Sequence, residues 1–357
     1  MIKTQKFAKT GALIGGASGL IYNLIKQFQR KNNDPNYQFD WESFFKDVLI
    51  GTVGGTAVGA GVGAVTDYRN AQQPKLNTTA LLTIAASNVV MDKSTNHYKE
   101  VSSKANKITR ILEQEFRPVM ARPIFRIGST LNGTALSDDF DIDLALEFRS
   151  GSFSSTKHMY DSVFHCLENK LYDNQLIEIR RQNKSLGVRF EGNSVEYKID
   201  VVPVKLSNTS NPKNTSGYLH KQNRSLFENH SRTKTDIEAL NNIQLTEVQK
   251  EVLVLLKHWR TSNDVPIGSH LLKSMIKDAY ASNIGRLPRD KTKKLILILK
   301  YIHDNIHNRR LVSVENTNNV VSNIPISDKD AIYAACKKVI SDYEYQPNSI
   351  IDHFYLR

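Results

Sequence analysis

The stretch of sequence that decides the fold reads Asp139-Phe140-Asp141-Ile142-Asp143-Leu144-Ala145-Leu146. Its alternation of acidic and apolar residues predicts a β-strand, in which successive side chains point to opposite faces. Asp141 and Asp143 therefore share one face, while Ile142 and Leu144 pack behind them. Two carboxylates held so close repel each other, and such a pair is typical of a site where divalent cations neutralise the charge.

A third carboxylate interrupts a later apolar run, which reads Tyr197-Lys198-Ile199-Asp200-Val201-Val202-Pro203. On a strand beside the first, Asp200 would complete an oxygen-only site for two Mg²⁺ ions, the arrangement used for in-line phosphoryl displacement. The alternative is a half-exposed strand after a polar loop, but nothing structural requires three acids to interrupt β-branched runs. We therefore predict that Asp141, Asp143 and Asp200 are catalytic metal ligands, with Mn²⁺ as a substitute for Mg²⁺.

A glycine-serine segment precedes the acidic strand and reads Gly128-Ser129-Thr130-Leu131-Asn132-Gly133-Thr134. It follows a short strand predicted over 123–127. Glycine at position 128 lets the backbone approach a triphosphate, and the Ser129 hydroxyl can hold a phosphate oxygen. Gly133 and Thr134 then turn the chain back towards the acids. Either motif alone is a weak signal, but the ordered set favours nucleotide chemistry.

These motifs resemble those of the polymerase-β-like nucleotidyltransferases, in particular the branch that contains cyclic GMP-AMP synthase, the oligoadenylate synthetases and the bacterial CD-NTases of antiphage defence. The resemblance implies an α+β fold, with a core of mixed sheet and flanking helices and a C-terminal helical lobe. It also implies that Gly128 and Ser129 bind the donor triphosphate while the three acids hold the metals. It spans roughly residues 95–340 and is strongest at 125–146, 195–204 and 250–275.

A second block extends the resemblance into the C-terminal part. A predicted helix carries Leu256-Lys257-His258-Trp259, and Pro266-Ile267-Gly268-Ser269 leads into another that includes Lys273. By resemblance to the Leu-Lys-x-Trp helix of the family and its downstream serine helix, Lys257 and Ser269 contact the nucleotide phosphates, and Lys273 is a further candidate. The residues alone leave open a solvated helix lysine at 257 and a helix cap at 269.

Composition sets limits on partners and compartment. The 357 residues carry a net charge of +12 with a pI near 9.4, which suits nucleotides, an oligonucleotide product or an anionic membrane surface. The two cysteines, Cys166 and Cys336, are far apart in sequence. They fit a reducing cytoplasm, and they are too few for a disulfide framework or for a cysteine-rich zinc ribbon. DNA sensing through a zinc ribbon is therefore not expected.

The first seventy residues hold ten of the 18 glycines, many of them spaced four apart. On helices over 11–25 and 48–65 they would form smooth stripes, the small-residue pattern of packed membrane helices. These helices would be roughly 22 and 27 Å long, against about 30 Å for the hydrocarbon core. We interpret them as a glycine-zipper hairpin that anchors a cytoplasmic catalytic part to the inner membrane.

Three other interpretations compete with a membrane hairpin. A signal peptide would export an ATP-dependent enzyme away from ATP, which disfavours it. A soluble glycine-rich hairpin packed on the enzyme remains an alternative. A low-complexity linker is the third, and the regular glycine spacing counts against it.

The predicted organisation has five parts: a glycine-rich hairpin over 1–70, a linker with a short helix over 71–94, a catalytic core over 95–231, a helical lobe over 232–345 and a tail over 346–357. Hydrophobic periodicity predicts helices at 78–91, 96–116, 157–171, 232–241, 246–261, 268–282, 290–307 and 327–342. Strands are expected near 176–181, 185–191 and 194–204. A mobile loop is expected over 207–231, in which Tyr218 and His220 are candidates for stacking on a base.

The resemblance implies an enzyme that joins nucleoside triphosphates, ATP foremost, into a cyclic or short linear oligonucleotide. That product would be a second messenger in bacterial antiphage defence, sensed by a separate effector protein. One alternative is template-independent synthesis of linear RNA or DNA, primed on a protein hydroxyl such as that of Tyr355 in the aromatic tail. Nucleotidylation of small molecules or of other proteins fits the helical lobe less well. A non-catalytic nucleotide-binding membrane scaffold is the alternative from a different class.

Overall fold

The computed structural model describes residues 77–138, 140–192, 195–207, 216–221, 232–241, 245–282, 287–313, 316 and 318–354. These residues belong to the compact unit Leu76–Arg357. The glycine-patterned segments 11–25 and 48–65, and Tyr355, lie outside them, so the hairpin, the membrane anchor and the tyrosine primer stay predictions. Among the helices of the described residues, none is both long and apolar enough to cross a lipid bilayer.

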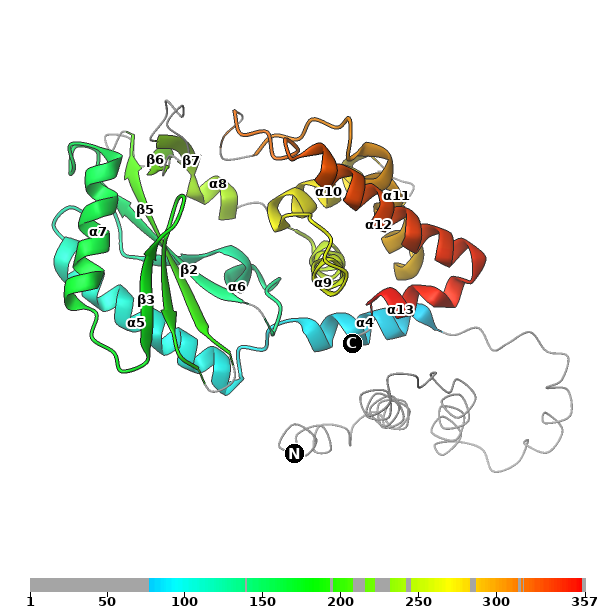
Figure 1. Ribbon diagram of the computed structural model, residues 1–357, viewed down its shortest axis with the longest axis horizontal. Coiled ribbons are helices and arrows are strands. Elements are labelled where there is room, and N and C mark those ends of the chain that lie inside the picture. Colours follow the sequence, from blue (N-terminus) through cyan, green and yellow to red (C-terminus); the bar gives the residue numbers. More distant parts are fainter. Residues whose placement is uncertain are drawn as a thin grey trace, which may run out of the picture. The chain divides into compact units, whose positions relative to one another are not determined.

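The described strands form one seven-stranded mixed sheet (Figure 1). Its main path runs in the order β1 (Phe125–Ile127), β2 (Asp141–Phe148), β5 (Tyr197–Leu206), β4 (Leu186–Phe190) and β3 (Leu176–Arg181). Strands β2 and β5 are parallel, whereas β1, β4 and β3 pair antiparallel to their neighbours. The two acid-bearing strands are therefore direct neighbours at the centre of the sheet.

Two helices cover one face of this sheet, α5 (Asn96–Phe116) and α7 (Thr156–Lys170). The apolar residues of α5 recur at helical spacing, as the periodicity predicts. Val101, Ala105, Ile108, Leu112 and Phe116 are buried, and Ile111 is half-buried against the same core. They pack on the apolar side of the alternating strands, which includes Ile142, Leu144, Ile199, Val201 and Val188. Because strand side chains alternate, the acids are left on the opposite face.

Two segments between residues 207 and 241 fold differently from the sequence prediction. The range 232–241, expected as a helix, forms β7 (Arg232–Asp236) and then the short helix α8 (Ile237–Asn241). The range 207–231, expected as a loop, contains β6 (Ser216–His220), which pairs with β5 and β7. Pairing with a neighbouring strand outweighs weak local preference here, because strand propensity depends on what lies alongside.

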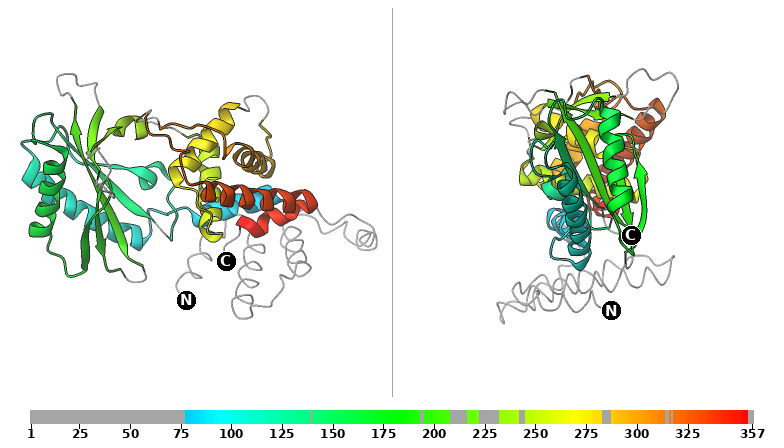
Figure 2. Two further views of the ribbon diagram at one scale, coloured as in Figure 1. Left: turned by 45° about the horizontal axis from the view of Figure 1, so that its top comes forward. Right: turned by 90° about the vertical axis from the view of Figure 1, so that its left-hand side faces the viewer.

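The helical lobe comprises α9 (Glu247–Ser262), α10 (Ser269–Ser282), α11 (Lys291–Asn305), α12 (Ile326–Tyr345), the 3-10 helix η3 (Pro347–Ser349) and α13 (Ile350–Phe354). The helix α4 (Thr78–Val89) belongs to it in space, although it precedes the sheet in sequence. It packs against α9, α11 and α13, and Figures 1 and 2 show it alongside α13. We call α4 with α9–α13 the helical lobe, and α5–α8 with the sheet the sheet lobe.

The end of α4 also reaches the loop that leads into the acidic strand. The backbone N–H of Met91 donates to Ala135 O at 2.9 Å, and that of Ser137 donates to Val89 O at 2.8 Å. Residue Val90 forms an isolated antiparallel bridge with Leu136. The last turn of α4 is therefore fastened to the segment just before β2.

Candidate active site

The structure brings the three predicted acids together. In the parallel pair of β2 and β5, Asp143 lies directly opposite Asp200, and Asp141 lies two residues before it on the same face. One carboxylate oxygen from each of the three lies within 4.8 Å of the others. The sequence could predict this set because all three occupy the polar phase of alternating strands.

Burial and mutual repulsion make ionisation of these carboxylates unfavourable. Burial, together with the charges of Asp141 and Asp200, raises the pKa of Asp143 to about 8. Burial and the nearby charge of Asp141 raise the pKa of Asp200 to about 6. Three half-buried carboxylates with no other donor type suit a hard divalent cation, so the residues present fit Mg²⁺ or Mn²⁺.

These shifts predict how stability changes with pH. Without a cation, the protein should lose stability as the pH rises from about 4 to about 8. Folded Asp143 keeps its proton up to about pH 8, whereas its ordinary pKa is 3.8, so the folded state binds more protons in this window. The contribution is complete below pH 3.8 and is lost as the pH rises through 8. Because Mg²⁺ binds the ionised carboxylates, it should raise the Tm more at pH 8 than at pH 5.

The measurement is thermal unfolding with and without Mg²⁺ between pH 5 and 8. Asp143→Asn is the matched control, since the amide has no proton to lose in this range. Subtracting its pH profile from that of the wild type isolates the contribution of Asp143. An Mg²⁺-induced Tm shift of equal size at both pH values would contradict the prediction.

The predicted phosphate segment lies against the acids. Residues Gly128–Asn132 form the short helix α6 rather than an open turn, directly after β1, in which Ile127 pairs with Asp143. Gly128 has a φ of +81°, and a Cβ placed there would lie 2.0 Å from Oδ2 of Asp143. Only glycine therefore fits at this position, and Ser129 follows it at the same edge of the acid cluster.

Lys257 of α9 connects the helical lobe to this site. Its side chain is buried, and its Nζ donates a hydrogen bond to Thr134 O at 2.9 Å. Burial and the nearby Arg260 lower the pKa of Lys257 to about 8, while Asp141 and Asp143 oppose that change. The interpretation of Lys257 as a solvated surface lysine is therefore wrong.

The other two predicted phosphate contacts lie on the next helix. Ser269 is the first residue of α10, and Lys273 follows one turn later. Burial, and then Lys277, lowers the pKa of Lys273, which is itself close enough to Lys257 to lower the pKa of that lysine. The phosphate-binding roles of Gly128, Ser129, Lys257, Ser269 and Lys273 stay predictions.

The turn between β3 and β4 contributes residues that sequence reasoning missed. Gln182 Nε2 donates to Asp200 Oδ1 at 3.2 Å, and Ser185 Oγ lies 3.4 Å from Asp200 Oδ2. The same Ser185 Oγ lies 2.5 Å from Gln182 Oε1. In the sequence these residues stand in a polar turn, Gln182-Asn183-Lys184-Ser185, with no signal beyond that of an ordinary hairpin. Only the strand register places them beside the third acid.

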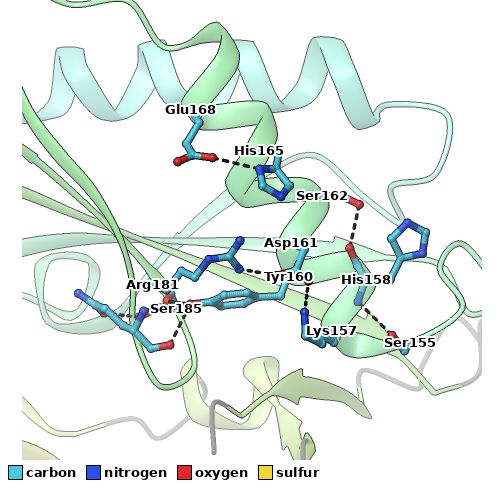
Figure 3. A network of polar contacts seen from close by, with 11 residues as sticks. Ser155, Lys157, His158, Tyr160, Asp161, Ser162, His165, Glu168, Arg181 and Ser185 are labelled. Atoms are coloured by element: carbon cyan, nitrogen blue, oxygen red, sulfur yellow. Dashed lines mark hydrogen bonds and ion pairs between the residues drawn. The ribbon is translucent and has the colours of Figure 1, made fainter.

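Tyr160 holds this turn from α7, as Figure 3 shows. Its hydroxyl lies 2.8 Å from Gln182 O and 2.8 Å from Ser185 O, and it accepts a hydrogen bond from Gln182 N at 2.9 Å. Beside it, Arg181 pairs with Asp161 and lies over the ring of Phe164 at 3.9 Å. The turn next to Asp200 is thereby fixed to the core helix.

Tyr160→Phe should destabilise the protein by about 1–2 kcal/mol, because it removes a buried hydroxyl that serves three backbone groups of the turn. Urea unfolding of the two proteins measures this difference. Ser162→Ala on the same helix is the control, since its hydroxyl bonds only to His158 O one turn earlier. A Tyr160→Phe protein with the stability of the wild type would show that the turn does not need this anchor.

The two candidates for base stacking differ in exposure. His220 is buried, with its ring 5.0 Å from that of Tyr160, so it is not available to stack on a base. Tyr218 is half-buried, and the guanidinium of Arg232 lies 4.9 Å from its ring centre. A stacking role for Tyr218 stays a prediction.

Comparison with known proteins gives structural but no sequence-level matches. No protein-family model matches the sequence, and no curated protein matches it. The structure is similar to that of Escherichia coli MS115-1 CdnC with ATP, at a TM-score of 0.58 and 18% identity, over 78% of this chain and 99% of that one. The same CdnC in a complex with HORMA-deltaN matches at a TM-score of 0.55 and 16% identity, over 78% and 98%.

A third similar structure is the Bradyrhizobium diazoefficiens CD-NTase CdnG in complex with GTP. Its TM-score is 0.58 at 13% identity, over 77% of this chain and 94% of that one. At these identities the likeness concerns the fold, and it extends over nearly the full length of each neighbour. The chain therefore has the same fold as these CD-NTase structures.

Proposed function

We propose that this protein is a Mg²⁺-dependent nucleotidyltransferase that joins nucleoside triphosphates into a cyclic or short linear oligonucleotide and releases pyrophosphate. The observation that carries the proposal is the pairing of Asp143 with Asp200 on adjoining strands, with Gly128 packed against the carboxylate of Asp143. Structural neighbours solved with ATP and with GTP support a nucleotide as substrate.

The acids, the glycine-serine segment and the lysines of the helical lobe each have a separate role in this reaction. Two divalent ions held by Asp141, Asp143 and Asp200 would neutralise the charge of the triphosphate and increase the acidity of the acceptor hydroxyl. The backbone at Gly128 and the Ser129 hydroxyl bind the donor phosphates. The ammonium groups of Lys257 and Lys273, with the Ser269 hydroxyl, face them from the helical lobe and hold the triphosphate in line with the acceptor.

In this proposal ATP is the foremost substrate, and the product is a second messenger of bacterial antiphage defence. A separate effector protein senses that product. The net charge of +12 favours retention of polyanionic substrates and intermediates near the protein. An intermediate that stays bound can be extended again or closed into a ring.

The test is incubation of the full chain with each NTP and dNTP, with Mg²⁺ or Mn²⁺, followed by mass analysis of soluble products and of the intact protein. Soluble cyclic or linear oligonucleotides, absent with an Asp141→Ala/Asp143→Ala protein, support the proposal. Nucleotide mass added to the protein would instead favour primed synthesis, and Tyr355→Phe tests that hydroxyl. If no nucleotide is consumed and the double variant keeps the cellular role, the protein acts as a non-catalytic scaffold.

A further inference from the structure

A row of paired residues crosses the acid-bearing face of the sheet, and the residue next to Asp200 in this row is a glycine. Asp143 pairs with Asp200, Asp200 with Gly187, and Gly187 with Arg180, across β2, β5, β4 and β3. The residue beside the third acid therefore has no side chain. A Cβ at Gly187 would lie 2.4 Å from Gln182 Nε2 and 3.1 Å from Arg180 Nε. The carboxamide of Gln182 occupies the space that any other residue at 187 would fill.

The orientation of this carboxamide is determined by its partners. Ser185 has one hydroxyl proton, and its Oγ is much closer to Gln182 Oε1, at 2.5 Å, than to Asp200 Oδ2, at 3.4 Å. Ser185 therefore donates to Gln182, and Oε1 is the acceptor end of the amide. The donor end, Nε2, is then directed at Asp200 Oδ1. The backbone of Gln182 is fixed in turn by the Tyr160 hydroxyl.

We propose that Gln182 is a positioning residue for the third metal ligand, and that Gly187 is required to admit it. Its amide holds one oxygen of Asp200 and so fixes this carboxylate beside Asp141 and Asp143, where a divalent cation needs it. Partners that orient a metal ligand contribute about 10- to 100-fold in affinity or activity. The kinetic part of this inference rests on the proposed function, whereas the metal-binding part does not.

The expected effects separate metal binding from substrate binding. Gln182→Ala should weaken Mn²⁺ binding about tenfold and lower kcat about tenfold. The KM for the donor nucleotide should stay nearly constant, because the predicted donor contacts lie at Gly128 and in the helical lobe. Gln182→Met fills a similar volume without a donor, and it should behave like Gln182→Ala if the hydrogen bond is what matters.

Gly187→Ala provides a test that leaves both Gln182 and Asp200 in the sequence. The added methyl group collides with Nε2 and displaces the carboxamide, so this variant should also lose about tenfold in Mn²⁺ affinity. In a Gln182→Ala/Gly187→Ala protein the collision with Nε2 is gone and the 3.1 Å contact with Arg180 Nε remains, so the loss should be close to that of Gln182→Ala alone. This non-additivity is the signature of the proposed arrangement.

The experiment is a titration with Mn²⁺ followed by electron paramagnetic resonance, on the wild type, the three single variants and the double variant. Thermal unfolding in parallel confirms that each protein is folded. Gln175→Ala, an exposed glutamine just before β3, is the matched control and should bind Mn²⁺ like the wild type. Steady-state kinetics with NTPs supply the comparison of kcat with KM.

The Mn²⁺ titrations and the kinetics together test the positioning role of Gln182 and the proposed function separately. Additive losses in the double variant, or Mn²⁺ binding by Gln182→Met equal to that of the wild type, would overturn the positioning role. If the wild type is active while the Gln182 and Gly187 variants match it in Mn²⁺ affinity and kcat, this inference fails and the proposed function stands. If the wild type makes no product but the Mn²⁺ titrations show the non-additive pattern, the positioning role stands and the proposed function fails. A wild-type protein that binds no Mn²⁺ would refute both.

Discussion

Asp143→Asn is expected to lower nucleotide incorporation by at least about a thousandfold, because it removes one of the three charges proposed to bind the catalytic cations. Asp143 lies opposite Asp200 in the paired strands and on the same face as Asp141, and Gly128 packs against its Oδ2. The amide has nearly the same shape, so the loss reports on charge and metal binding rather than on packing. Product formation with labelled NTP measures the effect.

The same substitution should stabilise the metal-free protein near pH 8. Burial and two neighbouring charges make ionisation of Asp143 unfavourable, as its pKa of about 8 shows, and asparagine removes that cost. Thermal unfolding without cations is the readout, and Asp304→Asn, at an exposed position of α11, is the control for losing an acidic charge. Undiminished incorporation by Asp143→Asn would refute the metal assignment, and a less stable protein would contradict the repulsion.

Gly128→Ala is the second substitution with a large expected effect, a loss of activity of about a hundredfold or more. Its methyl group would be placed 2.0 Å from Asp143 Oδ2, so either that carboxylate or α6 must move. The positive φ of +81° adds strain of about 1–3 kcal/mol for a residue with a Cβ. Both effects act on the predicted phosphate segment and on the proposed metal ligand Asp143 together.

Gly151→Ala separates backbone strain from collision. Gly151 has a similar φ of +86°, but a Cβ there would meet nothing within 4 Å. Both variants should therefore lose stability in urea unfolding, while only Gly128→Ala should lose product formation and Mn²⁺ affinity. Equal activity of the two variants would show that the contact between Gly128 and Asp143 does not matter for catalysis.

The sequence was informative where the relevant signal is local. The alternation around Asp141 and Asp143 predicts a strand with both acids on one face, and the long apolar period of 96–116 coincides with α5 at both ends. The short strands β6 and β7 were missed because each depends on its neighbour for pairing. The polar turn at 182–185 carries no sequence signal of a role either, because its contacts with Gly187 and Asp200 depend on the register of the strands.

Helix α4 connects the helical lobe with the segment that leads into the acidic strand. It is continuous with the chain that precedes Asn77, it packs along α9, and its far end is bonded through Val89 and Met91 to the segment just ahead of β2. Helix α4 therefore links the helical lobe to Ala135–Ser137, a few residues from Asp141. A shift of α4 against the helices that it packs on would therefore displace the segment that leads into the acidic strand.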